Sequence, residues 1–158
     1  MTVSVLACLF LVLISTVLHY EVLRGLHGGL PALRVPRRAK LLVVMFTTFL
    51  THAVEMAMYG GAFYSLVRWL GAGTLDGTAG FSLSTCMYFS AETYTSLGFG
   101  DLTPVGPVRL LAGVEALNGL LLIGWSASFL YIAMQRFWPQ TYSLGAASNH
   151  EAMPPRND

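Results

Sequence analysis

Three long apolar stretches dominate the pattern of hydrophobic and polar positions along the chain. They run from about Thr2 to His19, from Leu41 to Val67 and from Leu110 to Gln135. A helix needs about 20 mostly apolar residues to cross a bilayer, and each stretch approaches or exceeds that length. The pattern therefore predicts three membrane-spanning helices.

The segment between the second and third stretches, residues 68–109, has a mixed pattern. It is too polar to span a membrane and too apolar to be a plain surface loop. Its part 81-FSLSTCMYFSAETYTSL-97 predicts a short helix that enters the membrane partway. Ser82 or Ser84 can cap the first turn, and we expect the helix over about 82–95.

Composition and charge point to a membrane protein. The 158 residues are 54% hydrophobic and 11% charged, whereas an ordinary soluble domain carries about 25% charged residues. The formal net charge is only +1. That balance gives no support to a polyanionic partner, so we expect a lipid bilayer and no nucleic acid around this chain.

The basic residues are concentrated in the first connection. Five of the nine Lys and Arg residues lie there, namely Arg24, Arg34, Arg37, Arg38 and Lys40. The positive-inside rule places this connection in the cytoplasm. We therefore expect a multi-pass protein of the plasma membrane with its N-terminus outside and its C-terminus cytoplasmic. The same charges can hold anionic lipid headgroups.

The two ends of the chain are interpreted separately. No Lys or Arg precedes the first apolar stretch and no clear cleavage site follows it, so we interpret it as a retained membrane helix. The polar, proline-bearing residues 138–158 predict a disordered cytoplasmic tail. The expected division is an N-terminal helix in 1–23, a basic connection in 24–40, a membrane module in 41–137 and the tail in 138–158.

Alternating glycines set the stretch 96-SLGFG-100 apart. Non-helical backbone at membrane depth occurs only where protein buries it or water lines it, so this stretch implies a cavity or pore. Glycine adopts left-handed dihedrals at little cost, and alternating hands turn successive carbonyl groups to one side. A row of carbonyl oxygens can replace the water shell of a cation. Leu97 and Phe99 are then expected to point back into the protein.

The run 92-ETYTSLGFGD-101 resembles the pore signature of tetrameric potassium channels, whose filters read Thr-Val-Gly-Tyr-Gly-Asp and close variants. The resemblance covers about Leu41 to Phe137 and is closest to the bacterial two-helix pore type. It implies an all-α membrane protein with a re-entrant pore helix and selectivity filter between an outer helix, 41–69, and an inner helix, 108–137, preceded by one additional transmembrane helix. One filter per chain implies a homotetramer around a central pore.

The resemblance assigns roles to individual residues. The filter would be 96–100, with K⁺ in transit at Ser96, Leu97, Gly98 and Phe99 and with Gly100 at its outer end. Ser96, Leu97 and Phe99 depart from the usual threonine, valine and tyrosine. Support of the filter is assigned to Tyr88, Phe89, Glu92, Thr95 and Asp101.

Two of these assignments carry specific expectations. Glu92 and Asp101 are implied to contact each other and to set how readily the filter inactivates, because two close carboxyl groups share a proton more easily than both ionise. Tyr88 and Phe89 are implied to form an aromatic cuff around the filter.

The third apolar stretch contains glycines that the resemblance places at functional positions. Gly119 falls on the hinge position of the inner helix, and Gly124 on a second small residue where helices cross. Glycine costs about 1 kcal/mol in a helix interior relative to alanine, so bending or close packing should compensate. Hinge and packing are equally supported for Gly119, whereas packing is favoured for Gly124.

Polar residues also occur inside the apolar stretches: His52, Glu55, Glu115 and Asn118. His52 and Glu55 lie three apart on one helical face and can meet. We favour a structural role, with hydrogen bonds between helices. A sharper hypothesis makes His52 and Glu55 a pH-sensitive pair, because histidine titrates near physiological pH.

The sequence predicts a potassium-selective channel for passive flux through a central fourfold pore. No nucleophile–base set or metal spacing appears, and Cys8 and Cys86 supply neither, so we expect no enzymatic activity and no cofactor beyond the permeant K⁺. Two alternatives stay open: a weakly selective Na⁺/K⁺ channel, and a non-conducting regulatory or assembly subunit.

Overall fold

Four helices and two short strands make up the fold of the computed structural model, which describes residues 1–77 and 80–137. In chain order the elements are α1 (Thr2–Gly29), α2 (Arg37–Arg68), β1 (Thr74–Gly77), α3 (Leu83–Tyr94), β2 (Leu102–Val105) and α4 (Val108–Phe137). The predicted tail, 138–158, lies outside the described residues.

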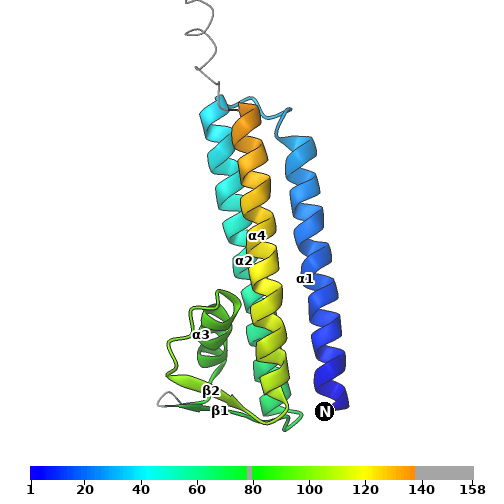
Figure 1. Cartoon of the computed structure of the whole chain (residues 1–158), viewed down its shortest axis with the longest axis vertical. Coiled ribbons are helices and arrows are strands. Elements are labelled where there is room, and N and C mark those ends of the chain that lie inside the picture. Colours follow the sequence, from blue (N-terminus) through cyan, green and yellow to red (C-terminus); the bar gives the residue numbers. More distant parts are fainter. Residues whose placement is uncertain (78–79, 138–158) are drawn as a thin grey trace, which may run out of the picture.

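The three long helices lie side by side as one bundle, and α3 packs against one end of it (Figure 1). They have 28, 32 and 30 residues and are apolar enough to cross a membrane, so the chain is a multi-pass membrane protein. The predicted fold class is confirmed: the chain is mostly helical, with a short helix and a loop between two spanning helices and a third spanning helix before them.

The helices extend further into the basic connection than the division 1–23 and 24–40 anticipates. α1 continues to Gly29, and α2 already begins at Arg37. The extra turns are supported by a small apolar cluster of Leu30, Val44 and Ala133, because buried contacts there outweigh the polar sequence. The non-helical connection is therefore only 30–36.

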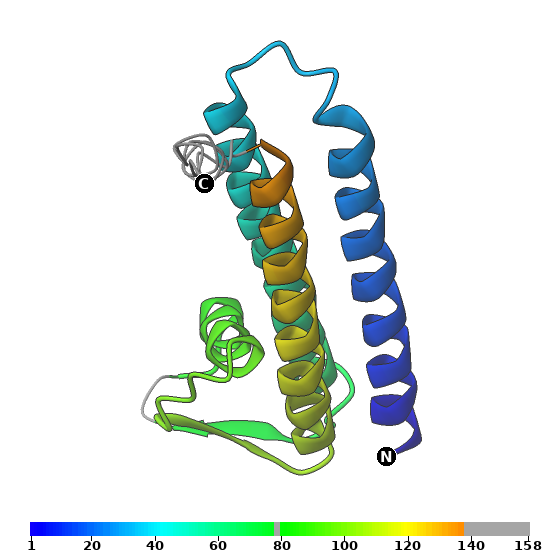
Figure 2. The same ribbon diagram turned by 45° about the horizontal axis from the view of Figure 1, so that its top comes forward.

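A small two-stranded sheet is the element that the sequence pattern does not indicate. Its strands are separated along the chain by α3. β1 and β2 pair antiparallel, with Thr74 opposite Val105 and Gly77 opposite Leu102. The two-stranded sheet lies beyond α3, at the end of the bundle that holds the N-terminus (Figure 2). Gly77 permits the pairing, because a side chain there would overlap the carbonyl oxygen of Asp101. The two-stranded sheet thus fixes the chain directly after the glycine-rich loop that contains residues 96–100.

The main core lies where α3 packs between α2 and α4. Tyr59, Phe63, Tyr94 and Leu111 are fully buried within it. Gly60 brings α2 close to α3, because a Cβ there would lie 3.0 Å from the Cα of Met87. This core holds the end of α3 at a fixed depth in the bundle.

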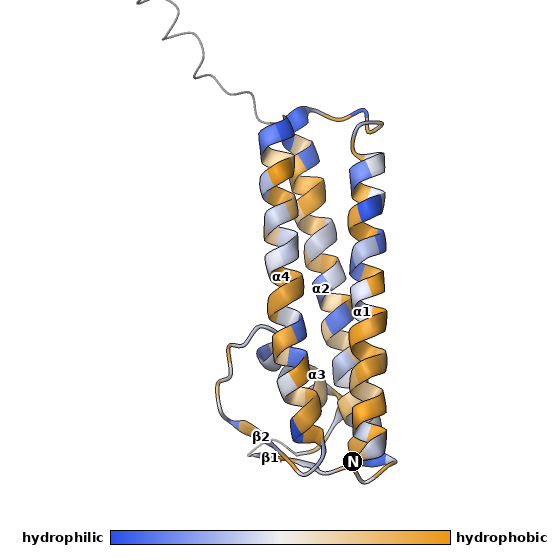
Figure 3. Cartoon of the chain, turned by 45° about the vertical axis from the view of Figure 1, so that its right-hand side comes forward, coloured by the Kyte–Doolittle hydropathy of each residue, from blue (hydrophilic) through white to orange (hydrophobic). Residues whose placement is uncertain are grey.

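The outer surface of the bundle is apolar along most of its length, whereas polar residues gather at the end that carries the 30–36 connection (Figure 3). Phe10, Phe46 and Phe49 are 62%, 71% and 71% exposed. Such a surface is suited to lipid or to another apolar protein surface rather than to water.

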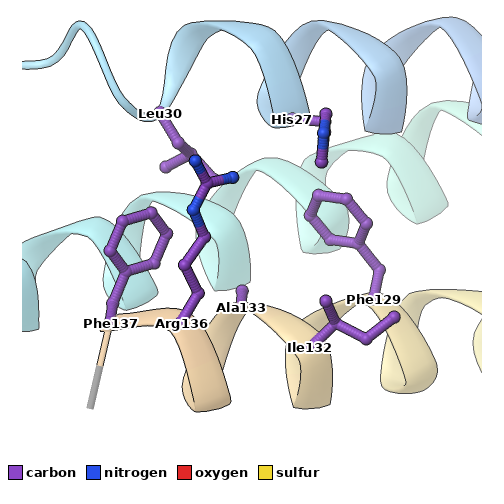
Figure 4. A pocket seen from close by; sticks show the side chains of 7 residues that line it. All are labelled: His27, Leu30, Phe129, Ile132, Ala133, Arg136 and Phe137. Carbon is purple, nitrogen blue, oxygen red and sulfur yellow. The ribbon is translucent and has the colours of Figure 1, made fainter. Parts of the chain in front are cut away.

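A small cavity of about 30 Å³ lies between α1 and α4 near the same end. The side chains of Arg136 and His27 border it together with apolar neighbours (Figure 4). Its volume is close to that of one water molecule, so it is too small for a lipid headgroup.

Candidate functional site

The glycine-rich loop connects the end of α3 to β2 and lies on the surface of the single chain. Every residue from Thr95 to Asp101 is exposed. Leu97 and Phe99, expected to point back into the protein, are 62% and 67% exposed. Within one chain neither side chain is covered, so the expectation that they point back into the protein stays a prediction.

The N–H groups of the loop are turned toward the end of α3. The carbonyl oxygen of Glu92 accepts hydrogen bonds from Leu97 N (2.9 Å) and Gly98 N (3.3 Å). The Glu92 carboxylate accepts a third from Phe99 N at 3.2 Å. No carbonyl from Ser96 to Gly100 accepts a hydrogen bond within the part of the chain that the structure describes. The N–H groups of Leu97, Gly98 and Phe99 are thus bonded inside the chain, whereas the carbonyl oxygens of the loop stay free.

The backbone hand alternates along the loop. The φ angle is +57° at Ser96, +53° at Gly98 and +80° at Gly100, whereas Leu97 and Phe99 between them do not have positive φ. The sequence indicates this alternation for the glycines only. Ser96 adopts the left-handed conformation despite its Cβ, at a cost of about 1–2 kcal/mol. The hydrogen bonds of the following N–H groups to Glu92 compensate for this cost.

Tyr88 and Phe89 do not act together, although the resemblance places both in an aromatic cuff. The ring of Tyr88 is stacked with that of Phe99 at 6.4 Å, and its hydroxyl donates to Asp101 Oδ1 at 3.3 Å. Phe89 instead faces the core and meets the ring of Phe63 edge to face, with the ring centroids 5.0 Å apart. Within one chain, therefore, Tyr88 supports the loop and Phe89 anchors α3 to α2.

Glu92 and Asp101 have different partners in the structure. Glu92 is buried and holds Phe99 N, whereas Asp101 is exposed and accepts from Tyr88. A direct contact between the two carboxyl groups stays a prediction. Thr95 caps the end of α3, with its hydroxyl donating to the Ala91 carbonyl at 2.8 Å.

Gly119 is a close-packing position. A Cβ there would overlap the carbonyl oxygen of Tyr94, the last residue of α3. Gly124 has nothing within 4 Å of such a Cβ, so the packing role expected for it is not met inside one chain. The inner helix is thus fitted to the backbone of α3 directly before the loop.

His52 and Glu55 do meet, and they belong to a larger buried cluster that joins all four helices. His52 Nδ1 lies 3.1 Å from Glu55 Oε2. His19 of α1 contacts the other carboxylate oxygen, Oε1, at 3.0 Å. Tyr94 of α3 donates its hydroxyl to Glu55, and Ser126 of α4 lies 3.1 Å from Nε2 of both histidines. We call these five residues the buried polar cluster.

Three members of the buried polar cluster do not emerge from the sequence pattern. His19 marks the end of the first apolar stretch and passes for its boundary, and Tyr94 and Ser126 are ordinary residues of apolar helices. The rule that polar groups inside a membrane have partners could have drawn attention to His19. Its partner could not be named without the packing of α1 on α2.

The histidines and the carboxylate of the buried polar cluster also have the residue types of a metal site. Within the described ranges 1–77 and 80–137, ligand atoms of His19, His52 and Glu55 lie within 4.8 Å of one another. These atoms already form hydrogen bonds with each other and with Tyr94 and Ser126. The cluster is therefore complete as a hydrogen-bonded network.

A second polar layer lies closer to the two-stranded sheet. Asn118 Nδ2 donates to Ser15 Oγ at 2.9 Å and to Tyr59 Oη at 3.1 Å, which joins α4 to α1 and α2. Glu115 is fully buried and contacts Ser90 of α3. The expected role of these intramembrane polar groups, hydrogen bonding between helices, matches the geometry.

Comparison with known proteins adds a family to this geometry. A family model described as an ion channel matches residues 41–136. The inward rectifier potassium channel Kirbac3.1 of Paramagnetospirillum magnetotacticum is 28% identical over 97 residues, which is 61% of this chain and 33% of that relative. The chain thus spans about a third of the length of the relative it matches.

No solved structure matches the chain. The matched residues, 41–136, include α3, the glycine-rich loop and nearly all of α2 and α4, whereas α1 lies outside them. The sequence-based assignment to a channel pore module is thereby confirmed at the level of the family: this chain belongs to the ion-channel family.

Proposed function

We propose that the chain forms a potassium-selective channel that allows passive flux of K⁺ through a central fourfold pore. One observation carries the proposal. In the loop 96–100, the N–H groups of Leu97, Gly98 and Phe99 are bonded to Glu92, the carbonyl oxygens are free among the described residues, and the backbone hand alternates. Free carbonyl oxygens in a row can take the place of water around a dehydrated cation. The sites for K⁺ would be Ser96, Leu97, Gly98 and Phe99.

A homotetramer follows from the exposure of this loop. One chain presents a single row of oxygens on an open surface, and a single row cannot surround a cation. Leu97 and Phe99 are largely exposed beside it, so apolar side chains next to the row also need cover. Four copies around an axis would supply both the ring of oxygens and the cover.

The relative supports the choice of cation. The matched protein is an inward rectifier potassium channel by name, with a match over 97 residues. The ion-channel family model, which matches residues 41–136, includes the loop. The departures at Ser96, Leu97 and Phe99 from the Thr-Val-Gly-Tyr-Gly pattern favour the second candidate, a weakly selective Na⁺/K⁺ channel. A non-conducting regulatory subunit is the third.

Membrane orientation is part of the same proposal. The basic residues of the first connection, Arg24, Arg34, Arg37, Arg38 and Lys40, lie at one end of the bundle, whereas Arg68 and Arg109 lie at the other end, near the two-stranded sheet. The positive-inside rule puts the end that carries the first connection in the cytoplasm of a cell whose plasma membrane holds the channel. The N-terminus, the two-stranded sheet and the outer end of the loop would then face outward. Anionic lipid would lie near the basic end of the bundle.

Flux measurements on the purified chain in liposomes test the proposal. In a gradient of potassium against sodium, we expect the reversal potential to lie close to the potassium equilibrium potential. Gly98→Ala should abolish this preference, because it places a Cβ on a left-handed residue of the row. Gly61→Ala is the matched control, since that helical glycine has nothing within 4 Å.

The outcomes separate the three candidates. A reversal potential near zero with clear flux would support the weakly selective channel instead. Absence of flux from a properly assembled particle would support the non-conducting subunit and contradict the proposal.

A further inference from the structure

The hydrogen atoms of the buried polar cluster can be counted from its contacts. Each short contact between two polar atoms needs one hydrogen between them, because two lone pairs facing each other repel. The contacts are His19 Nδ1 to Glu55, His19 Nε2 to Ser126, Ser126 to His52 Nε2, and Tyr94 to Glu55. His52 Nδ1 adds one more, because it lies against both Glu55 Oε2 and the Tyr94 hydroxyl.

These five contacts need five hydrogens, and the ordinary protonation states supply four. A neutral histidine has one N–H, so His19 and His52 contribute two hydrogens. The hydroxyls of Ser126 and Tyr94 contribute one each, and an ionised Glu55 contributes none. Ser126 is decisive, because its single hydrogen can serve only one of the two Nε2 atoms that lie 3.1 Å from it. The other ring must then donate from Nε2 as well as from Nδ1.

We propose that His19, His52 and Glu55 form one shared site that binds a single additional proton, and that this proton fastens α1 to the pore helix α3. The proton resides either on an imidazole, paired with the carboxylate, or on Glu55 itself. In both arrangements every contact has its hydrogen and the cluster is electrically neutral.

Neutrality is what the surroundings of the cluster demand. His19 and Glu55 are fully buried, and His52 is 15% exposed at its side chain. A net charge in such a place is costly, whereas a neutral, fully hydrogen-bonded group is tolerated. Two further ionisable side chains, Tyr59 of α2 and Glu115 of α4, lie near enough to Tyr94 to act on it electrostatically. Both are engaged in the second polar layer, with Asn118 and Ser90.

The additional proton links α1 to the filter loop. His19 is the only α1 member of the cluster, and Tyr94 is the last residue of α3, two residues before Ser96. Removal of the proton would leave one contact without a hydrogen and one negative charge buried among four helices. The cluster would then have to open, and α1 would lose its strongest polar tie to the pore module.

Unfolding of the full chain in detergent tests this inference without reference to conduction. Between about pH 7.5 and 9 the unfolded chain has neutral histidines and ionised Glu55, since free histidine titrates near pH ~6.5. The folded cluster keeps one more proton than the unfolded chain, so folding loses stability as the pH rises. The proton of the cluster should by itself increase the unfolding equilibrium constant about tenfold per pH unit while it stays bound. Glu115 adds its own contribution to the slope, because its contact with Ser90 also needs a proton that the unfolded chain lacks.

Two variants should remove the contribution of the cluster, so that the wild-type unfolding constant rises about tenfold more per pH unit than theirs. In Glu55→Gln the amide itself brings the missing hydrogen, so the network is complete with neutral histidines. In Ser126→Ala the two contacts of the hydroxyl disappear, and three hydrogens then serve the three contacts that are left. Ser128→Ala is the matched control on the same helix, because its exposed hydroxyl bonds only to the Gly124 carbonyl; it should keep the wild-type slope.

A wild-type slope no steeper than that of Glu55→Gln in this range would overturn the inference. So would an unchanged slope in Ser126→Ala, which keeps the test decisive if Glu55→Gln fails to fold. Failure of potassium selectivity would leave these expectations as they are, because the measurement concerns proton binding alone.

Discussion

Glu92 holds the glycine-rich loop with both its main-chain carbonyl and its side-chain carboxylate. Its carbonyl binds Leu97 and Gly98, and its carboxylate binds Phe99 N. Because all three bonds come from one buried residue, the position of the free carbonyl oxygens depends on it. The resemblance to potassium channels singled out Glu92, but it indicated Asp101 rather than the loop backbone as the partner.

Replacement of Glu92 should therefore destabilise the glycine-rich loop. Glu92→Ala removes the acceptor of Phe99 N–H, which is worth about 1.5–3 kcal/mol for a bond to a charged group. We expect open lifetimes in single-channel recordings to shorten roughly tenfold or more. Glu92→Gln retains a carbonyl oxygen at the same place and should stay near the wild type. Unchanged lifetimes in Glu92→Ala would show that the loop does not depend on this bond.

Gly119 and Gly124 form a natural pair of tests, since they lie on one helix and differ only in what surrounds them. Gly119→Ala drives a Cβ into the Tyr94 carbonyl, and overpacking of this kind costs about 1–3 kcal/mol. Gly124→Ala has open space and should be neutral or stabilising by up to ~1 kcal/mol through helix propensity. Thermal unfolding in detergent measures both. Equal effects of the two changes would argue that Gly119 is a hinge rather than a packing site.

At the level of elements, the spanning helices follow from the length of the apolar stretches, and α3 follows from its cap and mixed pattern. Ser82 accepts the N–H of Thr85 at 3.1 Å, as its position before the helix suggests. The two-stranded sheet does not follow from the sequence pattern, because each strand has four residues and contains glycine or proline. Such strands are specified by the close approach of two backbones, which no periodicity announces.

The contact of α3 with α4 depends on Glu115 in a way that hydrogen counting makes testable. The Ser90 hydroxyl has one hydrogen but lies against both the Met56 carbonyl and Glu115 Oε1. Glu115 must then donate to Ser90, as a carboxylic acid does. Glu115→Gln should preserve the contact, whereas Glu115→Ala should cost about 2–5 kcal/mol by leaving a cavity and an unpaired hydroxyl.

Chemical or thermal unfolding of the two Glu115 variants provides the measurement. Glu115→Gln should unfold within about 1 kcal/mol of the wild type, which is a small effect for a fully buried position. A Glu115→Gln variant as unstable as Glu115→Ala would mean that the group is needed as a carboxylate.

For the molecule as a whole, the sequence indicates the pore module but not how α1 relates to it. The glycine motif is local, and its chemistry can be inferred from residue type and spacing. The buried polar cluster instead joins His19, Glu55, Tyr94 and Ser126 from four helices, so it exists only once the bundle is packed. A cluster of common residue types that are far apart in the sequence cannot be predicted from local sequence patterns.

The central claim concerns oxygens contributed by several copies, and a structure of the assembled particle in potassium solution tests it most directly. Single-particle electron microscopy of the full chain in a lipid nanodisc should show four copies around one axis. Density for ions should lie on that axis beside the carbonyl groups of Ser96 to Phe99. A particle of any other symmetry, or a fourfold particle whose 96–100 loop lies away from the axis, would contradict the account.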